Sequence, residues 1–139
     1  MDGKLVKPYS LKEKTIWVAG ETGMVGSATV RRLASEHCRL LSANRKELDL
    51  RNQADVMTWM KHNKPDIIVL AAATVGGILA NSTRPAEFLY DNLAIESNII
   101  HAAHKNKTEK LLFLGSACIY PRDALQPMAE NALLTGPLE

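Results

Sequence analysis

Three glycines at positions 20, 23 and 26 form a spaced motif that could bind a phosphate group. Residues 20–26 have the sequence Gly-Glu-Thr-Gly-Met-Val-Gly and follow the apolar run Ile-Trp-Val-Ala at 16–19. A short strand that runs into spaced glycines and then a helix places a dinucleotide pyrophosphate at the helix N-terminus, where free N–H groups and the helix dipole favour an anion. Gly20 would allow the tight turn, Gly23 would let backbone approach the pyrophosphate, and Gly26 would let the helix pack closely on the sheet. The alternative is a glycine-rich turn that binds no ligand.

A basic pair lies where the ribose of such a dinucleotide would be recognised. Enzymes that use NAD usually carry an acidic residue there, about 20 residues after the glycines, which binds the ribose 2′-hydroxyl. This chain has Asn44, Arg45 and Lys46 instead. Two cations after a neutral amide favour a 2′-phosphate and therefore NADP(H), and Asp49 lies where its carboxylate could accept a hydrogen bond from the adenine amino group. The alternative is that Arg45 and Lys46 form an ordinary solvated patch.

Small and nucleophilic side chains follow two later apolar segments. Residues 71–73 are three alanines, small enough to let a cofactor lie flat, and residues 115–121 are Gly-Ser-Ala-Cys-Ile-Tyr-Pro. Ligands of open parallel sheets bind beyond the carboxyl ends of the strands, so the hydroxyl of Ser116 and the thiol of Cys118 would meet at that edge. Taken singly, each would be a small core residue. Their joint position at the functional edge favours a chemical role.

The elements that must position these residues alternate between strands and helices. The sequence predicts strands at 15–19, 39–43, 66–72 and 110–115, a short strand at 47–50, and helices at 24–36, 53–63 and 85–105. Asn52 is a suitable N-cap for the second helix, and Pro85 suits the first turn of the third. Residues 74–84 and most of the tail from Pro121 are predicted to be loop. This alternation predicts an α/β fold of Rossmann type, a parallel sheet with helices on both faces.

Composition fits one globular domain and excludes several classes of partner. The chain has 139 residues, a formal net charge of +2 and a hydrophobic content of 46%, and we expect a flexible arm at 1–14 and the domain at 15–139. The charge is small and scattered, so neither nucleic acid nor a membrane surface is indicated as a partner. The longest apolar run, at 67–73, is too short to span a bilayer, and the polar start lacks the apolar segment of a signal peptide. We expect a soluble cytoplasmic protein.

The spacing of cysteines and histidines predicts no metal site. Cys38 and Cys118 lack Cys-x-x-Cys spacing and are expected to be reduced thiols. His101 and His104 are three residues apart on the predicted helix at 85–105, but no carboxylate or cysteine stands at a suitable spacing around them.

Four segments together resemble the GDP-L-fucose synthases of the extended short-chain dehydrogenase/reductase superfamily. They are the glycine loop at 20–26, Ala-Ala-Ala-x-Val-Gly-Gly-Ile at 71–78, Asn-Ile-Ile-His-Ala-Ala at 98–103 and Gly-Ser-x-Cys-Ile-Tyr-Pro at 115–121. The resemblance covers about residues 15–139. It implies an NADP-dependent 3,5-epimerase and 4-reductase whose substrate is the GDP-sugar GDP-4-keto-6-deoxy-D-mannose.

The resemblance also implies roles for individual residues. Ser116 would be the serine of the Ser-Tyr-Lys catalytic set, and Cys118 would be the base of the epimerisation. Contacts with NADP(H) are implied for Gly20, Thr22, Gly23, Met24, Val25, Gly26, Arg45, Asp49, Leu50, Ala71, Ala72, Leu114, Gly115, Ser116 and Ala117. The helix at 85–105, whose apolar residues exceed what one sheet face can bury, would form half of a four-helix homodimer interface. Thr22 stands where many bacterial members are expected to have a basic residue.

One part of the superfamily pattern is missing from the 139 residues. Tyr9, Tyr90 and Tyr120 are followed four residues later by Glu, Ala and Ala, so no Tyr-x-x-x-Lys pair is present. We therefore expect the N-terminal, NADP-binding part of a longer protein, with an incomplete sheet and without the substrate domain, that is inactive alone. Two alternatives stay open. One is another extended short-chain nucleotide-sugar epimerase or dehydratase, which usually lacks the Cys-Ile-Tyr-Pro continuation. The other is a non-catalytic nucleotide-binding or dimerisation module.

Overall fold

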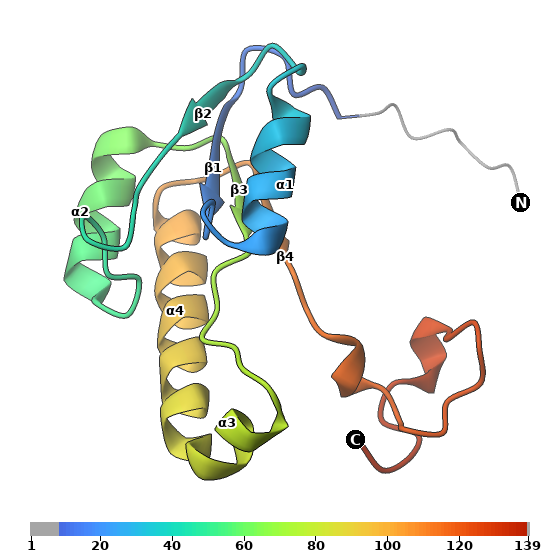
Figure 1. Ribbon diagram of the computed structural model, residues 1–139. Coiled ribbons are helices and arrows are strands. Elements are labelled where there is room, and N and C mark those ends of the chain that lie inside the picture. Colours follow the sequence, from blue (N-terminus) through green and yellow to red (C-terminus); the bar gives the residue numbers. More distant parts are fainter. Residues whose placement is uncertain (1–8, 139) are drawn as a thin grey trace, which may run out of the picture.

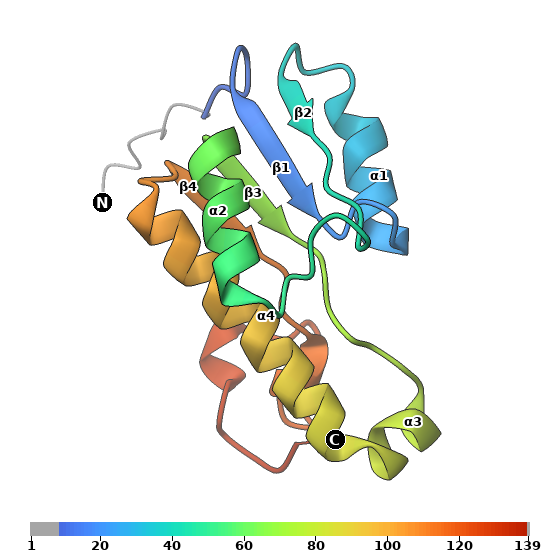
Figure 2. The same ribbon diagram turned by 90° about the vertical axis from the view of Figure 1, so that its left-hand side faces the viewer.

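The computed structural model describes residues 9–138. Within them, four parallel strands form one sheet in the order β2-β1-β3-β4. This part of the chain contains the strands β1 (Thr15–Ala19), β2 (Arg39–Leu41), β3 (Ile67–Leu70) and β4 (Lys110–Phe113) and the helices α1 (Met24–Leu33), α2 (Gln53–Asn63), α3 (Ile78–Thr83) and α4 (Pro85–Lys105). α1 covers one face of the sheet, while α2 and α4 lie side by side on the other (Figures 1 and 2). The predicted α/β sheet with helices on both faces is confirmed.

Two apolar cores form because successive residues of a strand point to opposite faces of the sheet. On β1, Trp17 belongs to the core shared with α2 and α4, where it packs with residues such as Met60 and Ile99. Ile16 and Val18 belong to the core on the other face, which Leu33 of α1 closes. Full burial of side chains of this size contributes roughly 1.5–3 kcal/mol each, so β1, together with β3 beside it, holds both layers together.

Two helix starts agree with the sequence. The Asn52 side chain accepts hydrogen bonds from the N–H groups of Ala54 and Asp55, at 3.0 and 3.3 Å, and so caps α2. A cap of this kind is worth about 1 kcal/mol. Pro85 occupies the first turn of α4, where its missing N–H has no helical partner to lose.

The predicted short strand at 47–50 is wrong, because these residues form turns. The N–H groups of Glu47 and Leu48 both donate to the Asn44 carbonyl at 3.0 Å. The Leu50 carbonyl accepts a hydrogen bond from the side chain of the buried Asn98 on α4, at 3.0 Å. The backbone groups are thus used within the segment and against α4, and the apolar Leu48 enters the core from a turn.

Other boundaries differ because they depend on partners elsewhere in the chain. β1 ends at Ala19, which pairs with Leu70, so β3 ends where its neighbour ends. The predicted loop at 74–84 contains α3, a short helix that begins after Gly77 and lies against the first turns of α4 (Figure 1). The Asn81 side chain donates to the Gly76 and Gly77 carbonyls at 2.9 and 3.0 Å, which ties α3 to the residues that precede it.

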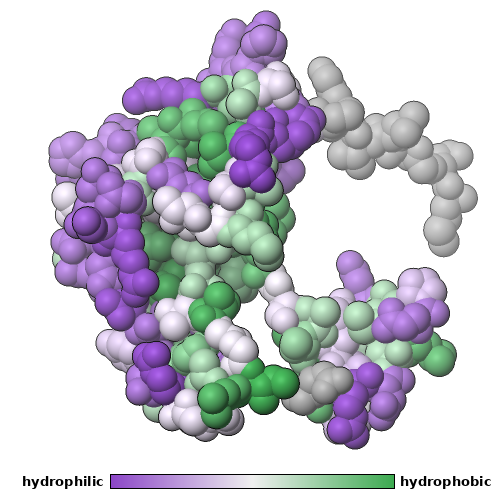
Figure 3. Space-filling view, in the orientation of Figure 1, coloured by the Kyte–Doolittle hydropathy of each residue, from purple (hydrophilic) through white to green (hydrophobic). Residues whose placement is uncertain are grey.

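The first and the last of the described residues differ in how they contact the sheet. Lys14 and Tyr9 both donate to the Glu109 carboxylate, at 2.7 and 2.5 Å, and lower the pKa of that carboxyl. Leu11 packs against the core on the α1 side, so residues 9–14 of the predicted arm contact the domain, and residues 1–8 lie outside the described residues. Beyond β4 the chain forms a lobe set apart from the sheet (Figures 1 and 3), closed on itself by a hydrogen bond from Arg122 N–H to the Pro137 carbonyl.

Among residues 9–138, no helix combines the length and the apolar character that a membrane crossing requires.

Candidate functional site

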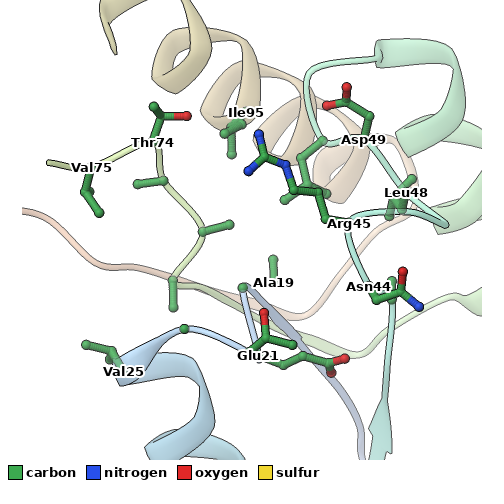
Figure 4. Close-up of a pocket in the computed structure, with 18 of the residues that line it drawn as sticks. Ala19, Glu21, Val25, Asn44, Arg45, Leu48, Asp49, Thr74, Val75 and Ile95 are labelled. Atoms are coloured by element: carbon green, nitrogen blue, oxygen red, sulfur yellow. The ribbon is translucent and has the colours of Figure 1, made fainter. Parts of the chain in front are cut away.

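A pocket of about 500 Å³ lies at the carboxyl ends of β1 and β3. From β1 the chain crosses to the edge strand β2 and then returns past β1 to β3. Such a switch point is where open α/β sheets bind ligands, because the two outgoing segments separate there. Three segments line most of the pocket: the glycine loop at 20–25, residues 43–45 and 48–51 after β2, and residues 71–75 after β3 (Figure 4).

The glycine loop leaves no room for side chains at two of its glycines. Gly20 has φ +91°, and a Cβ added there would lie 2.7 Å from the Ala72 nitrogen. A Cβ on Gly26 would lie 2.0 Å from the Gly20 carbonyl oxygen, so α1 approaches the turn after β1 as closely as backbone permits. These contacts agree with the roles of tight turn and close packing that the spacing predicted for Gly20 and Gly26.

The start of α1 has the properties of an anion site. Gly23 is the N-cap and offers no side chain to the first turn, which contains no acidic residue. Within the described chain, the N–H groups of Met24 and Val25 have no hydrogen-bond acceptor, and both residues are exposed at the pocket. Free N–H groups at the positive end of a helix dipole fit a pyrophosphate.

The segment after β2 contributes charged groups of both signs. Arg45 is exposed, lines the pocket and takes part in no ion pair among residues 9–138. Asp49 is bound instead: its carboxylate accepts from Arg51 Nε at 3.0 Å and Nη2 at 2.8 Å. Hydrogen bonds from the Arg51 side chain and N–H hold the pKa of Asp49 at about 2, below its usual 3.8. Asp49 is therefore ionised at neutral pH, and its carboxylate already accepts hydrogen bonds from the Arg51 guanidinium.

A network of hydrogen bonds fixes the side of the pocket that is formed by the residues after β3. Arg51 Nη1 lies 3.2 Å from Asp91 Oδ1, and the Thr74 hydroxyl donates to Asp91 Oδ2 at 3.1 Å. Thr74 also exchanges two hydrogen bonds with the Asn92 side chain, at 2.7 and 2.9 Å. α4 thus holds both the segment after β2 and the segment after β3, which keeps the pocket open between them.

Ser116 and Cys118 lie together but outside this pocket. Both are exposed on the short turn that follows β4, and the Cys118 N–H donates to Ser116 Oγ at 3.1 Å. A hydroxyl oxygen that accepts a backbone hydrogen bond keeps its own proton free for another acceptor. None of the residues 114–118 lines the pocket.

The structure therefore gathers most of the predicted cofactor residues in one place. Ten of them line the pocket: Gly20, Thr22, Gly23, Met24, Val25, Arg45, Asp49, Leu50, Ala71 and Ala72. Gly26 is buried directly beneath the loop. Sequence reasoning missed Glu21 and the link from Arg51 through Asp91 to Thr74. Glu21 could have been found, because it is the one carboxylate within the glycine motif, whereas a charged residue on a helix such as Asp91 usually indicates a solvated face.

Comparison with known proteins gives the family. The sequence profile of the NAD dependent epimerase/dehydratase family matches residues 16–139, nearly the whole chain. The chain belongs to this family. Its most similar relatives include a GDP-L-fucose synthase of Sinorhizobium fredii (strain NBRC 101917 / NGR234), which is 56% identical over 131 residues, 94% of this chain and 42% of the relative. A GDP-L-fucose synthase of Escherichia coli (strain K12) is 51% identical over 93% of this chain and 40% of the relative. This family member spans about two fifths of the length of the curated relatives it matches.

Solved structures agree with the fold. A GDP-mannoheptose C4 reductase from Campylobacter jejuni with NADP bound superposes with a TM-score of 0.85 at 38% identity, over 91% of this chain and 40% of that one. A GDP-L-fucose synthetase from Naegleria fowleri bound to NADP gives a TM-score of 0.82 at 26% identity, over 95% of this chain and 40% of that one.

Proposed function

We propose that this chain supplies the dinucleotide-binding part of an NADP-dependent enzyme that converts GDP-4-keto-6-deoxy-D-mannose to GDP-L-fucose. The observation that carries the proposal is the pocket itself. An uncapped helix N-terminus and an exposed arginine meet there, in a chain that is 56% identical to a GDP-L-fucose synthase. The first fits a pyrophosphate, and the second fits a 2′-phosphate, since guanidinium groups bind phosphate oxygens in a charge-assisted manner.

The chemistry divides between the cofactor and residues of the chain. Bound NADPH supplies the hydride that reduces the ketone. The glycine loop and Arg45 hold the nucleotide in place. Cys118, as a thiolate, takes a proton from a carbon next to the ketone, and the electron pair of that C–H bond moves to the ketone oxygen. The Ser116 hydroxyl donates a hydrogen bond to this oxygen and stabilises its charge. A separate general acid delivers another proton to the opposite face of that carbon, which inverts its configuration.

Replacement of Arg45 tests the nucleotide assignment. In the full-length gene product, Arg45→Ala is expected to weaken NADPH binding by about tenfold to a hundredfold, because a charge-assisted contact with the 2′-phosphate is lost. NADH has no such phosphate, so its affinity should change little. Lys46→Ala is the matched control, since Lys46 is also an exposed cation but does not line the pocket. Equal losses for NADPH and NADH in Arg45→Ala would contradict the assignment.

We also infer that α4 mediates homodimerisation. Among the apolar residues of this helix, Phe88, Ile95 and Ile99 are buried against the rest of the chain, whereas Leu89, Leu93 and Ile100 are 63%, 56% and 47% exposed. The exposed leucines and isoleucine recur at intervals of four and seven residues, which places them along one side of the helix. A contiguous apolar stripe on a surface favours association with a like surface.

A charge placed on this stripe should separate the dimer. The full-length gene product is expected to sediment as a dimer at tens of micromolar, and Leu93→Arg as a folded monomer. The reason is that an arginine would be buried without a partner at the interface. Ala34→Arg adds the same charge at the exposed end of α1, on the other face of the sheet, and should remain dimeric. A monomeric wild-type protein, or a dimeric Leu93→Arg variant, would count against the interface.

A further inference from the structure

The carboxylate of Glu21 lies at the carboxyl end of β2. The residue belongs to the glycine loop, directly after Gly20, yet its Oε1 accepts a hydrogen bond from Ser42 Oγ at 2.5 Å. Ser42 follows Leu41, the last residue of β2. The contact therefore holds the half-buried Glu21 side chain at the carboxyl end of β2, the place where Rossmann folds recognise the ribose of the adenosine half.

This carboxylate and Arg45 border the same opening. Both residues line the pocket, and Figure 4 shows the Glu21 carboxylate turned toward the segment that carries Asn44 and Arg45. Within residues 9–138, neither Glu21 nor Arg45 has an ion-pair partner. Each charge is therefore available to a ligand, and the two are not neutralised by one another.

The two charges favour different groups at the 2′ position of the ribose. A phosphate monoester carries close to two negative charges at neutral pH, so a 2′-phosphate is attracted by Arg45 and repelled by Glu21. A 2′-hydroxyl can donate a hydrogen bond, and a carboxylate is the acceptor that NAD-binding folds commonly present to it. Discrimination between the two nucleotides is a difference of affinities, and opposed charges at one site reduce that difference.

We propose that Glu21 is a specificity-determining residue that lets the pocket bind NAD(H) as well as NADP(H). The proposal rests on the proposed function, since it requires that the pocket bind a dinucleotide. Ser42 is the positioning residue: its hydroxyl keeps the Glu21 carboxylate at the end of β2.

The test measures the dissociation constants of NADPH and NADH for the full-length gene product. Binding is followed by quenching of tryptophan fluorescence, because Trp17 lines the pocket and Trp59 lies beside it, with a distance of 4.4 Å between the two ring centroids. The wild-type protein is expected to bind both nucleotides. Glu21→Gln keeps an acceptor for Ser42 but removes the charge, and should raise the preference for NADPH over NADH by about tenfold. Ser42→Ala, which leaves the charge but releases it, should shift the preference in the same direction by a smaller factor.

Glu13→Gln is the matched control, because Glu13 is an exposed carboxylate just before β1, at the opposite end of this strand from the pocket. It makes the same change in net charge and should leave the preference unchanged. An unchanged preference in Glu21→Gln, with NADPH still bound, would overturn the role of Glu21 and leave the proposed function standing. A wild-type protein that binds neither nucleotide would overturn both.

Discussion

Cys118→Ser is expected to abolish the exchange of solvent deuterium into the substrate at the carbons that flank the ketone. Epimerisation needs a base beside these carbons, and a positioned base of this kind contributes about a hundredfold or more to the rate. Reduction needs a hydride and an acid but not this base. Oxidation of NADPH should therefore remain measurable in the Cys118→Ser variant of the full-length gene product, while exchange, followed by NMR, disappears.

Two further variants make this result specific. Ser116→Ala should impair both exchange and NADPH oxidation, because both steps pass through charge on the same ketone oxygen. Cys38→Ser is the matched control: Cys38 is partly buried, and its thiol lies 3.6 Å from the Leu33 carbonyl, on the α1 side of the sheet. Exchange that persists undiminished in Cys118→Ser would refute the assignment of the base.

Gly26→Ala is expected to destabilise the protein by about 3 kcal/mol, a large share of the roughly 5–15 kcal/mol that stabilise a typical domain. The added Cβ would lie 2.0 Å from the Gly20 oxygen and 2.7 Å from the Gly20 carbonyl carbon. Both are backbone atoms, so relief requires α1 to move away from the turn after β1. The midpoint of urea unfolding, followed by circular dichroism, measures the loss.

Gly77→Ala separates this clash from a general effect of losing a glycine. A Cβ at Gly77 would have no atom within 4 Å, and its φ of −73° suits any residue. At this helix N-cap, where Ala is a poorer residue than Gly, the change should cost about 0.5–1 kcal/mol, well below the loss expected for Gly26→Ala. Equal stability of Gly26→Ala and the wild-type protein would show that the loop can rearrange, and would weaken its assignment as a rigid cradle.

Local patterns in the sequence determined the framework of the site. The spacing of apolar residues placed β1 at its observed bounds, the Asn52 cap placed the start of α2, and Pro85 placed the start of α4. The glycine spacing predicted the turn at Gly20 and the close approach at Gly26. These features depend on residues that are neighbours in the chain, so their physical causes are present in a short stretch of sequence. The roles of Ser116 and Cys118 are likewise predictions from the sequence, and they stay predictions.

Tertiary contacts decided the features that involve partners distant in sequence. Residues 47–50 alternate between polar and apolar side chains, as a strand does. Their backbone groups, however, form hydrogen bonds with the Asn44 carbonyl and the Asn98 side chain. The apolar residues of α4 look alike in sequence, and only packing decides that Ile99 is buried and Leu93 exposed. Glu21 reaches Ser42 only because β2 pairs beside β1. The sheet brings residues together that lie twenty or more positions apart, and the energy of such contacts appears only once the chain has folded.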